Sequence, residues 1–400
     1  MPTRRRVLAA TASVLFLPLV DGPLAAASTG PLAASVAVGW QRSAARTIYV
    51  ERGSAPALGA LYLAFTSLAV HDAASKAQKH GTHAAAAAVA TAAHDVLLEY
   101  FPASGVALAA DLAASLARVP DGTKKDAGVV IGAAAAAAMI ASRVGDGRND
   151  TSIVYSKAPA LGVWQPPPTG MLLPWLGYVD RVVDVPPVPV GGPDPITSAA
   201  YAVDFEEVRT LGSIAGTART AEQTAVALFF GGNPVLTYRN ALCDFLDAEP
   251  LGLLPTTRLL ARIDAAVANS FIQTWRLKFE VGFWRPFQAV AAAAVDGNPG
   301  TNPHPVAWAS LVPTPAYSEY TSGHAAATSP FAEVLRRTLG DGIPLVLRSG
   351  GVTRTYDSLS ALEFDAFHAR IWGGLHFRRA MEDGYRLGHT TAGRVIDTVH

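Results

Sequence analysis

The stretch Lys278-Phe-Glu-Val-Gly-Phe-Trp-Arg285-Pro286 is the first of three short clusters that together decide the fold. The second is Tyr317-Ser-Glu-Tyr-Thr-Ser322-Gly323-His324, and the third is Arg370-Ile-Trp-Gly-Gly-Leu-His376. The clusters supply three fixed cations, a serine hydroxyl, a glycine amide and two imidazoles. Arginine offers a planar fork that binds two oxygens at once, and lysine offers a compact point charge. The set therefore predicts a binding site for a highly charged tetrahedral or trigonal-bipyramidal oxyanion.

Helical spacing places the first two clusters at helix ends. We expect a long helix over about residues 256–283, because five residues recur along one face of it: Asp264, Val267, Phe271, Trp275 and Lys278. Proline disfavours helix at the residue before it, so this helix should end or kink before Pro286. The Ser-Gly-His triplet directly precedes an alanine-rich run, and its amides should therefore lie at a positive helix N-terminus.

The pattern K-x6-R-P, then S-G-H, then R-x5-H resembles the superfamily of vanadium-dependent haloperoxidases and type 2 phosphatidic acid phosphatases, which includes acid phosphatases. All three parts occur in order with the family's spacing, over about the last third of the chain. The long, alanine-rich build is similar to the bacterial secreted chloroperoxidase-like branch. The resemblance implies an all-α, large helical-bundle fold with its active site at the end of the C-terminal bundle.

The resemblance also implies vanadate as cofactor, with phosphate able to compete for the same site. The residues that would bind it are Lys278, Arg285, Ser322, Gly323, His324, Arg370 and His376. Among them His376 would be the vanadium ligand, and Lys278, His324 and His376 would be catalytic. Trp275 and Tyr317 fall where the chloroperoxidase-like proteins line the halide site, although both are equally well explained as core aromatics.

Two activities are compatible with such a pocket. In the haloperoxidase reading, hydrogen peroxide oxidises halide to a hypohalous-acid equivalent, which then halogenates a small organic substrate. In the acid phosphatase reading, His376 attacks a phosphate ester and forms a phosphohistidine. A third hypothesis, a non-catalytic phosphate or vanadate binder, is less favoured because a binder needs neither histidine.

One position departs from the superfamily pattern. The third motif usually continues H-x3-D, and the aspartate orients the histidine, whereas this chain has Ala380, with Glu382 and Asp383 further on. A nucleophilic histidine benefits from an acidic partner. The missing carboxylate therefore favours the haloperoxidase over the phosphatase, with a backbone carbonyl expected to orient the ring instead.

Composition excludes other classes of function. Half of the 400 residues are hydrophobic, the formal net charge is zero, and the mature chain has no dense run of Lys and Arg. Nucleic-acid binding therefore has little support. Cys243 is the single cysteine, so an internal disulfide and a thiolate metal cluster are both excluded.

The chain is expected to carry an export signal over residues 1–27 and one helical domain over 28–400. Arg4, Arg5 and Arg6 precede a short apolar run and Ala25-Ala26-Ala27, which is typical of a twin-arginine signal, with an ordinary secretory signal as the alternative. The apolar run is shorter than the ~20 residues of a membrane span. We therefore expect a secreted or periplasmic protein without a stable span after the signal is removed.

The domain itself divides by composition into three parts. Residues 28–149 are helix formers interrupted near Gly53–Pro56, His80–Gly81, Pro102 and Pro120–Gly122, and within them 128–142 is expected to be a buried bundle helix. Residues 150–195 are rich in proline and tryptophan, and we expect them to be ordered and packed across the helices. Residues 196–400 form the half that carries the anion site, with either a short hairpin or an irregular loop expected around Gly350–Gly351.

Overall fold

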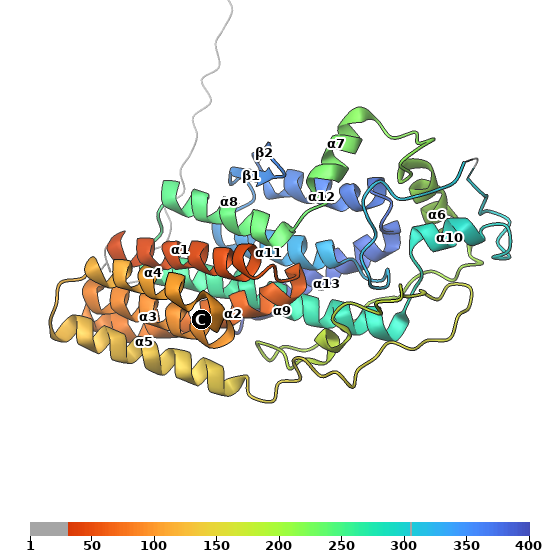
Figure 1. The fold of residues 1–400 in the computed structure, drawn as a ribbon. Helices are drawn as coiled ribbons and strands as arrows, with labels where there is room; N and C mark the ends of the chain where they lie inside the picture. Colours follow the sequence, from red (N-terminus) through yellow and green to blue (C-terminus); the bar gives the residue numbers. More distant parts are fainter. Residues whose placement is uncertain (1–30, 305) are drawn as a thin grey trace, which may run out of the picture.

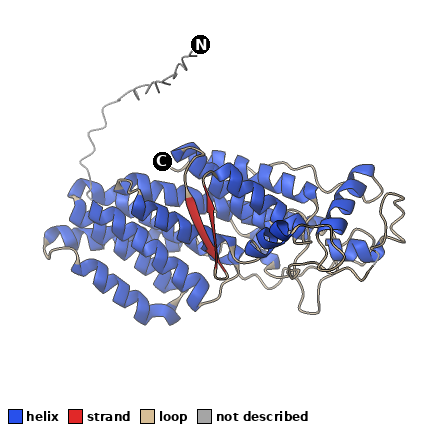
Figure 2. Ribbon diagram, turned by 90° about the horizontal axis from the view of Figure 1, so that it is seen from above, coloured by secondary structure: helices blue, strands red, loops and turns tan. Residues whose placement is uncertain are grey.

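The computed structural model describes residues 31–304 and 306–400, and this part of the chain is helical apart from one hairpin and several long loops (Figures 1 and 2). The expected export signal over residues 1–27 lies outside the described residues. At the centre is α9 (Leu253–Val281), which packs against α2 of the N-terminal half and against α11 and α13 of the C-terminal half. The expectation of an all-α fold is confirmed.

Five α-helices form the N-terminal bundle. They are α1 (Pro31–Ala45), α2 (Pro56–Ala77), α3 (Thr82–Tyr100), α4 (Gly105–Ala117) and α5 (Thr123–Ser142). Short π-helical and 3-10 turns join them: η1 (Arg46–Glu51), η2 (Gln78–His80) and η3 (Pro102–Ser104). The helix boundaries fall at the glycine and proline positions that interrupt the sequence pattern, because these residues break the run of good helix formers.

Small side chains allow the helices of this bundle to approach closely. A Cβ atom at Gly128 would lie 2.3 Å from the Ala84 carbonyl oxygen, and one at Gly132 would lie 2.4 Å from that of Ala88. The backbones of α3 and α5 are therefore in direct contact at these two glycines.

The prediction that residues 128–142 form a buried helix is only partly right. The helix packs on α3 and α2, yet only 22% of the apolar window of Thr123–Ser142 is buried, compared with 78% for Pro56–His80. By length and composition alone, both of these helices could cross a membrane. The difference arises because α2 lies between neighbours, whereas α5 lies on the outer side of the bundle (Figure 1).

The proline-rich segment is ordered and packed on α9, with one short 3-10 helix, η4 (Pro174–Tyr178). The side-chain amide of Asn269 accepts from Val182 N–H (2.9 Å) and donates to the Val183 carbonyl (2.8 Å). One turn later, Gln273 pairs in the same way with both backbone groups of Val188. These amides satisfy backbone groups that the prolines leave without a regular partner.

Seven further helices and one hairpin make up the C-terminal half with α9. The helices are α6 (Ala199–Leu211), α7 (Ala221–Phe229), α8 (Pro234–Ala248), α10 (Pro286–Ala292), α11 (Gly323–Leu339), α12 (Leu359–Trp372) and α13 (Arg378–Ile396). Strands β1 (Leu345–Ser349) and β2 (Val352–Tyr356) pair antiparallel. Gly350 and Gly351 both have positive φ, 55° and 80°, as a two-residue hairpin turn requires.

Candidate active site

The first cluster lies where α9 ends and α10 begins. Lys278 is in the last turn of α9 and is fully buried, on the same face as Trp275. Gly282 ends the helix with a left-handed conformation (φ 63°), which glycine adopts without strain. Arg285 follows as the residue before α10, with Pro286 as the first helical residue, so the guanidinium is held at a rigid corner.

The second cluster forms the N-terminus of α11. Ser322 caps the helix, since its Oγ accepts from Ala325 N–H (3.4 Å), and Gly323 and His324 are the first helical residues. Ser322 N–H donates to the Ala380 carbonyl (3.3 Å). This bond joins the second cluster to the start of α13, just after the third cluster.

The third cluster spans the connection between α12 and α13. Arg370 is in the last turn of α12, and the helix ends at Trp372, immediately before two glycines. Gly374 has a positive φ of 76°, and a Cβ there would lie 2.5 Å from the Gly212 carbonyl oxygen. The glycines thus permit a tight turn that brings His376 back towards the other two clusters.

Arg285 and His376 are in direct contact. Arg285 Nη1 donates to His376 Nε2 (3.2 Å) and to the Leu375 carbonyl (2.8 Å), and its Nε donates to the Tyr317 carbonyl (2.9 Å). Because a guanidinium has no acceptor, Nε2 must be the unprotonated nitrogen of the imidazole. Burial, followed by the charge of Arg285, lowers the pKa of His376 well below 6.5, in agreement with a neutral ring.

A carboxylate that the motif comparison did not assign contacts the other nitrogen of this ring. Glu319 Oε1 accepts from His376 Nδ1 (2.9 Å) and from Phe377 N–H (3.0 Å). Burial raises the pKa of Glu319 to about 8, although Arg285 and Lys278 oppose the shift. The expectation of a backbone carbonyl as partner is therefore wrong. In the sequence, only the position of Glu319 within the second cluster indicated that this residue lies near the site.

The Lys278 ammonium donates to backbone carbonyls, whereas its expected role was to bind the anion. It donates to the carbonyls of Ser318 (3.0 Å), Glu319 (3.0 Å) and Thr321. These three bonds use all the donors of an ammonium group. Burial, followed by the charge of Arg285, lowers the pKa of Lys278 well below 10.5. In this structure Lys278 holds the loop of the second cluster, and it contributes its positive charge to the site from there.

Three buried polar side-chain atoms of the motif clusters have no hydrogen-bond partner in the protein: Arg285 Nη2, Arg370 Nε and His324 Nε2. Burial lowers the pKa of Arg370 to about 10, and burial with the Arg370 charge lowers that of His324 well below 6.5. A buried polar atom without a partner is unfavourable by about 1–3 kcal/mol. An oxyanion among these atoms would accept from the two arginines and the Gly323 amide, and a protonated oxygen of the same anion would donate to His324 Nε2. The residues therefore fit vanadate or phosphate.

The two aromatic residues expected at a halide site lie together beside this group. The rings of Trp275 and Tyr317 are 5.0 Å apart, and the Lys278 ammonium lies 4.9 Å from the Tyr317 ring. Both line an apolar cavity of about 40 Å³ that also reaches Phe271 and His324. A cavity of this size has room for one or a few small molecules.

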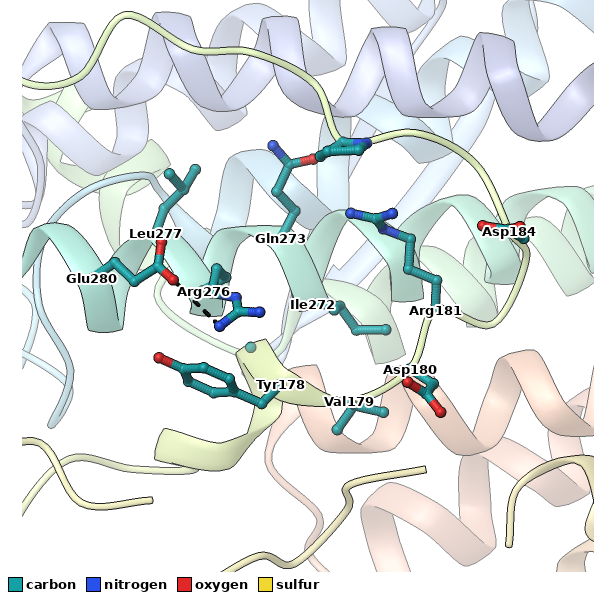
Figure 3. Close-up of a pocket in the computed structure, with 12 residues that line it drawn as sticks. Tyr178, Val179, Asp180, Arg181, Asp184, Ile272, Gln273, Arg276, Leu277 and Glu280 are labelled. Carbon is teal, nitrogen blue, oxygen red and sulfur yellow. Dashed lines mark ion pairs between the residues drawn. The ribbon is translucent and has the colours of Figure 1, made fainter. Parts of the chain in front are cut away.

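A larger cavity of about 700 Å³ lies on the opposite side of α9, between this helix and residues 177–187 (Figure 3). There the Arg276 guanidinium stacks on Tyr178 at 3.9 Å and pairs with Glu280 at 3.3 Å. None of the three motif clusters contributes a predicted site residue to its lining. Size alone therefore does not identify the reactive site of this protein.

Comparison with known proteins finds a match over the part of the chain that contains the three motif clusters. Residues 258–400 match the family model of the VCPO second helical-bundle domain, whereas a search of curated proteins found no match. Among solved structures, a bacterial vanadium-dependent iodoperoxidase matches with a TM-score of 0.73 and 19% identity, over 95% of this chain and 99% of that one.

Two structures of bacterial vanadium-dependent chloroperoxidase are also similar. The apo form has a TM-score of 0.70 with 16% identity, over 86% of this chain and 93% of that one. The holo form has a TM-score of 0.67 with 16% identity, over 86% of this chain and 91% of that one. The chain therefore has the fold of the bacterial vanadium-dependent haloperoxidases, and the resemblance to the vanadium haloperoxidase superfamily is confirmed.

Proposed function

We propose that the protein is a vanadium-dependent haloperoxidase that oxidises halide with hydrogen peroxide to a hypohalous-acid equivalent. The observation that carries the proposal is the convergence of three unpartnered buried atoms, on Arg285, Arg370 and His324, around the neutral His376 ring. The fold relationship to vanadium-dependent iodo- and chloroperoxidases supports it.

The residues of the site would have distinct roles. His376 Nε2, the unprotonated nitrogen of the ring, would be the vanadium ligand once the anion replaces it as acceptor for Arg285 Nη1. Arg285 and Arg370, with the Gly323 amide and the Ser322 hydroxyl, would hold the oxygens of the anion. Vanadate, when bound, supplies a Lewis acid that activates peroxide.

His324 would move the protons. It is neutral because burial and Arg370 disfavour its charged form, so it is ready to accept a proton. The fixed charges of Arg285 and Arg370 act in a buried site, where electrostatic stabilisation is stronger than in water. The cavity beside Trp275 and Tyr317 would admit halide and peroxide.

The acid phosphatase alternative keeps specific support. The sequence argument against it was the missing aspartate at Ala380, but Glu319 supplies a carboxylate to His376 Nδ1 at 2.9 Å. A nucleophilic histidine would therefore have its acidic partner after all. The haloperoxidase remains the first proposal because the solved structures that share the fold are vanadium-dependent peroxidases.

The deciding experiment compares two reactions on the same preparation. Bromination of a phenolic dye with hydrogen peroxide is measured with and without orthovanadate, beside hydrolysis of p-nitrophenyl phosphate. We expect bromination that depends on vanadate and is inhibited by phosphate. Rapid ester hydrolysis by the bare protein, with no bromination by the vanadate-loaded protein, would establish the phosphatase instead.

We also propose that the protein is exported through a twin-arginine signal, on the basis of Arg4 and Arg5 before the short apolar run. Replacing both by lysine should leave uncleaved precursor inside the cell, as detected by immunoblotting of cell fractions. Unchanged export of that variant would rule out the twin-arginine signal.

A further inference from the structure

We infer that Glu319 is the positioning residue that fixes the imidazole of His376 with Nε2 towards the bound anion. It thereby replaces the carboxylate that position 380 lacks. The inference rests on the proposed binding of vanadate or phosphate at His376, and it assigns a role to a residue outside the three motif patterns.

The geometry supports a single orientation of the ring. Glu319 Oε1 accepts both from the His376 Nδ1–H (2.9 Å) and from the neighbouring Phe377 N–H (3.0 Å). The opposite nitrogen, Nε2, accepts from Arg285 Nη1 (3.2 Å). Because Arg285 only donates, the proton must lie on Nδ1, and Glu319 is the acceptor of that N–H. Glu319 and Arg285 therefore select the tautomer together, and Glu319 fixes the direction of the ring through Nδ1.

Other nearby carboxylates are engaged elsewhere. Asp383 accepts from the Tyr320 hydroxyl (2.7 Å) and pairs with Arg379 (3.1 Å) and Arg386 (2.8 Å), so it does not reach His376. Glu382 is exposed on the outer face of α13. Neither of the two acidic residues that follow the third motif therefore contacts His376.

Glu319 is itself held rigidly by the end of α9. Its N–H donates to the Phe283 carbonyl (3.0 Å), and its own carbonyl accepts from the Lys278 ammonium (3.0 Å). Both sides of the peptide are therefore anchored, and the side chain starts from a fixed point. This explains why Lys278 uses its donors on the loop: it supports the segment that orients His376.

The small side chain of Ala380 lies beside Glu319. Ala380 and Glu319 line one small cavity of about 10 Å³, together with Phe377. Asp194 and Asp204 line the same cavity, and Asp204 already raises the pKa of Glu319. A further carboxylate at position 380 would add to this repulsion, so an uncharged residue is favoured there while Glu319 is present. The Ala380 backbone is still used, because its carbonyl accepts from Ser322 N–H (3.3 Å).

The first test reads the tautomer in protein without vanadate. Nitrogen-15 NMR of histidine-labelled protein should show His376 protonated at Nδ1, and Glu319→Gln should keep this tautomer because its side-chain oxygen still accepts. Glu319→Leu has similar volume and no acceptor, so Arg285 alone would select the tautomer and a form protonated at Nε2 should become detectable. A His376 protonated at Nε2 in the unmodified protein would overturn the inference without any variant.

The second test measures binding of orthovanadate alone by vanadium-51 NMR. Glu319→Leu should weaken binding about 10–100-fold, as expected for a group that orients a ligand, while Glu319→Gln should stay within about three-fold of the unmodified protein. Adding Ala380→Asp to Glu319→Leu should restore part of the loss. Asp383→Asn is the matched control, because it alters a buried carboxylate that does not contact His376.

These outcomes separate the two proposals. Unchanged vanadate affinity and an unchanged tautomer in Glu319→Leu would show that Glu319 has only a packing role. Failure of the unmodified protein to bind vanadate would refute the proposed cofactor, while the tautomer measurement would still decide the role of Glu319.

Discussion

The α3–α5 contact of the N-terminal bundle and the candidate site of the C-terminal half bury different kinds of residue. In α3 the run Ala84–Ala88 is completely or almost completely buried, and α5 meets it through Gly128 and Gly132. Around the candidate site, by contrast, Lys278 and Arg285 are 0% exposed. The N-terminal bundle gains stability from close contact of small apolar groups, whereas the C-terminal half buries charges that such packing alone cannot stabilise.

This difference shows where the protein tolerates the unfavourable burial of charged groups. Removing a charged group from water is unfavourable unless partners compensate for it, and burial accordingly shifts the pKa of Lys278 and His324 downward. Carbonyl groups compensate Lys278, but Arg285, Arg370 and His324 keep atoms without a partner. Substitutions in the two halves should therefore affect different properties, activity in one and stability in the other.

The largest effect is expected from His376→Ala. The substitution removes the proposed bond to vanadium and leaves Glu319 without its ring partner, although the cations still attract the anion. Halogenation should fall to background in the peroxide assay, while circular dichroism stays helical. Bromination at the rate of the unmodified protein would contradict the assignment of His376 as ligand.

His324→Ala should lower turnover by about 10²–10⁴-fold, the usual contribution of a positioned acid–base group. Vanadate binding should survive, because the arginines and His376 remain. The kinetic assay is combined with vanadium-51 NMR to separate the two effects. His83→Ala, at an exposed histidine of the N-terminal bundle, is the control and should change neither quantity.

Gly132→Ala tests the other half. The new Cβ would lie 2.4 Å from the Ala88 carbonyl oxygen, so α3 and α5 must separate, with a loss of about 1–3 kcal/mol in the free energy of unfolding. Gly39→Ala on α1 is the matched control, since nothing lies within 4 Å of its Cβ. It should stabilise the protein by about 0.4–1 kcal/mol. Denaturant unfolding measures both, and destabilisation of equal size would refute the close-contact argument.

The smallest effect is a pH dependence at Asp204. Burial raises its pKa from 3.8 to about 6, although the Arg379 N–H opposes the shift. The native state then holds a proton that the unfolded state has released, so the stability contributed by Asp204 is lost as pH rises from about 4 to about 6. Asp204→Asn lacks this titration.

The variant should therefore gain stability relative to the unmodified protein between pH 4 and pH 7, by roughly 1–3 °C in melting temperature. Differential scanning calorimetry at both pH values checks the sign. A constant difference between the two proteins would contradict the raised pKa.

Much of the helical framework was predictable because local chemistry decides it. The face that carries Asp264, Trp275 and Lys278 is buried along α9, and Ser322 caps α11 where the Ser-Gly-His motif predicted a helix start. The hairpin turns at Gly350 and Gly351, as glycine pairs favour. The exposure of α5 was not predictable, since an alanine-rich helix looks the same whether it lies inside or at the edge of a bundle.

The sequence by itself determined the helices, their ends and the three clusters of donors, because spacing, capping and backbone freedom act over a few residues. Only the tertiary structure decided which partner each buried charge has. It brings Glu319 to His376 across 57 positions of the chain and directs the Lys278 donors to backbone carbonyls. Such pairings depend on how α9, α11 and α13 pack together, and a carboxylate in an assigned motif position can be replaced by one from any segment that reaches the same point in space.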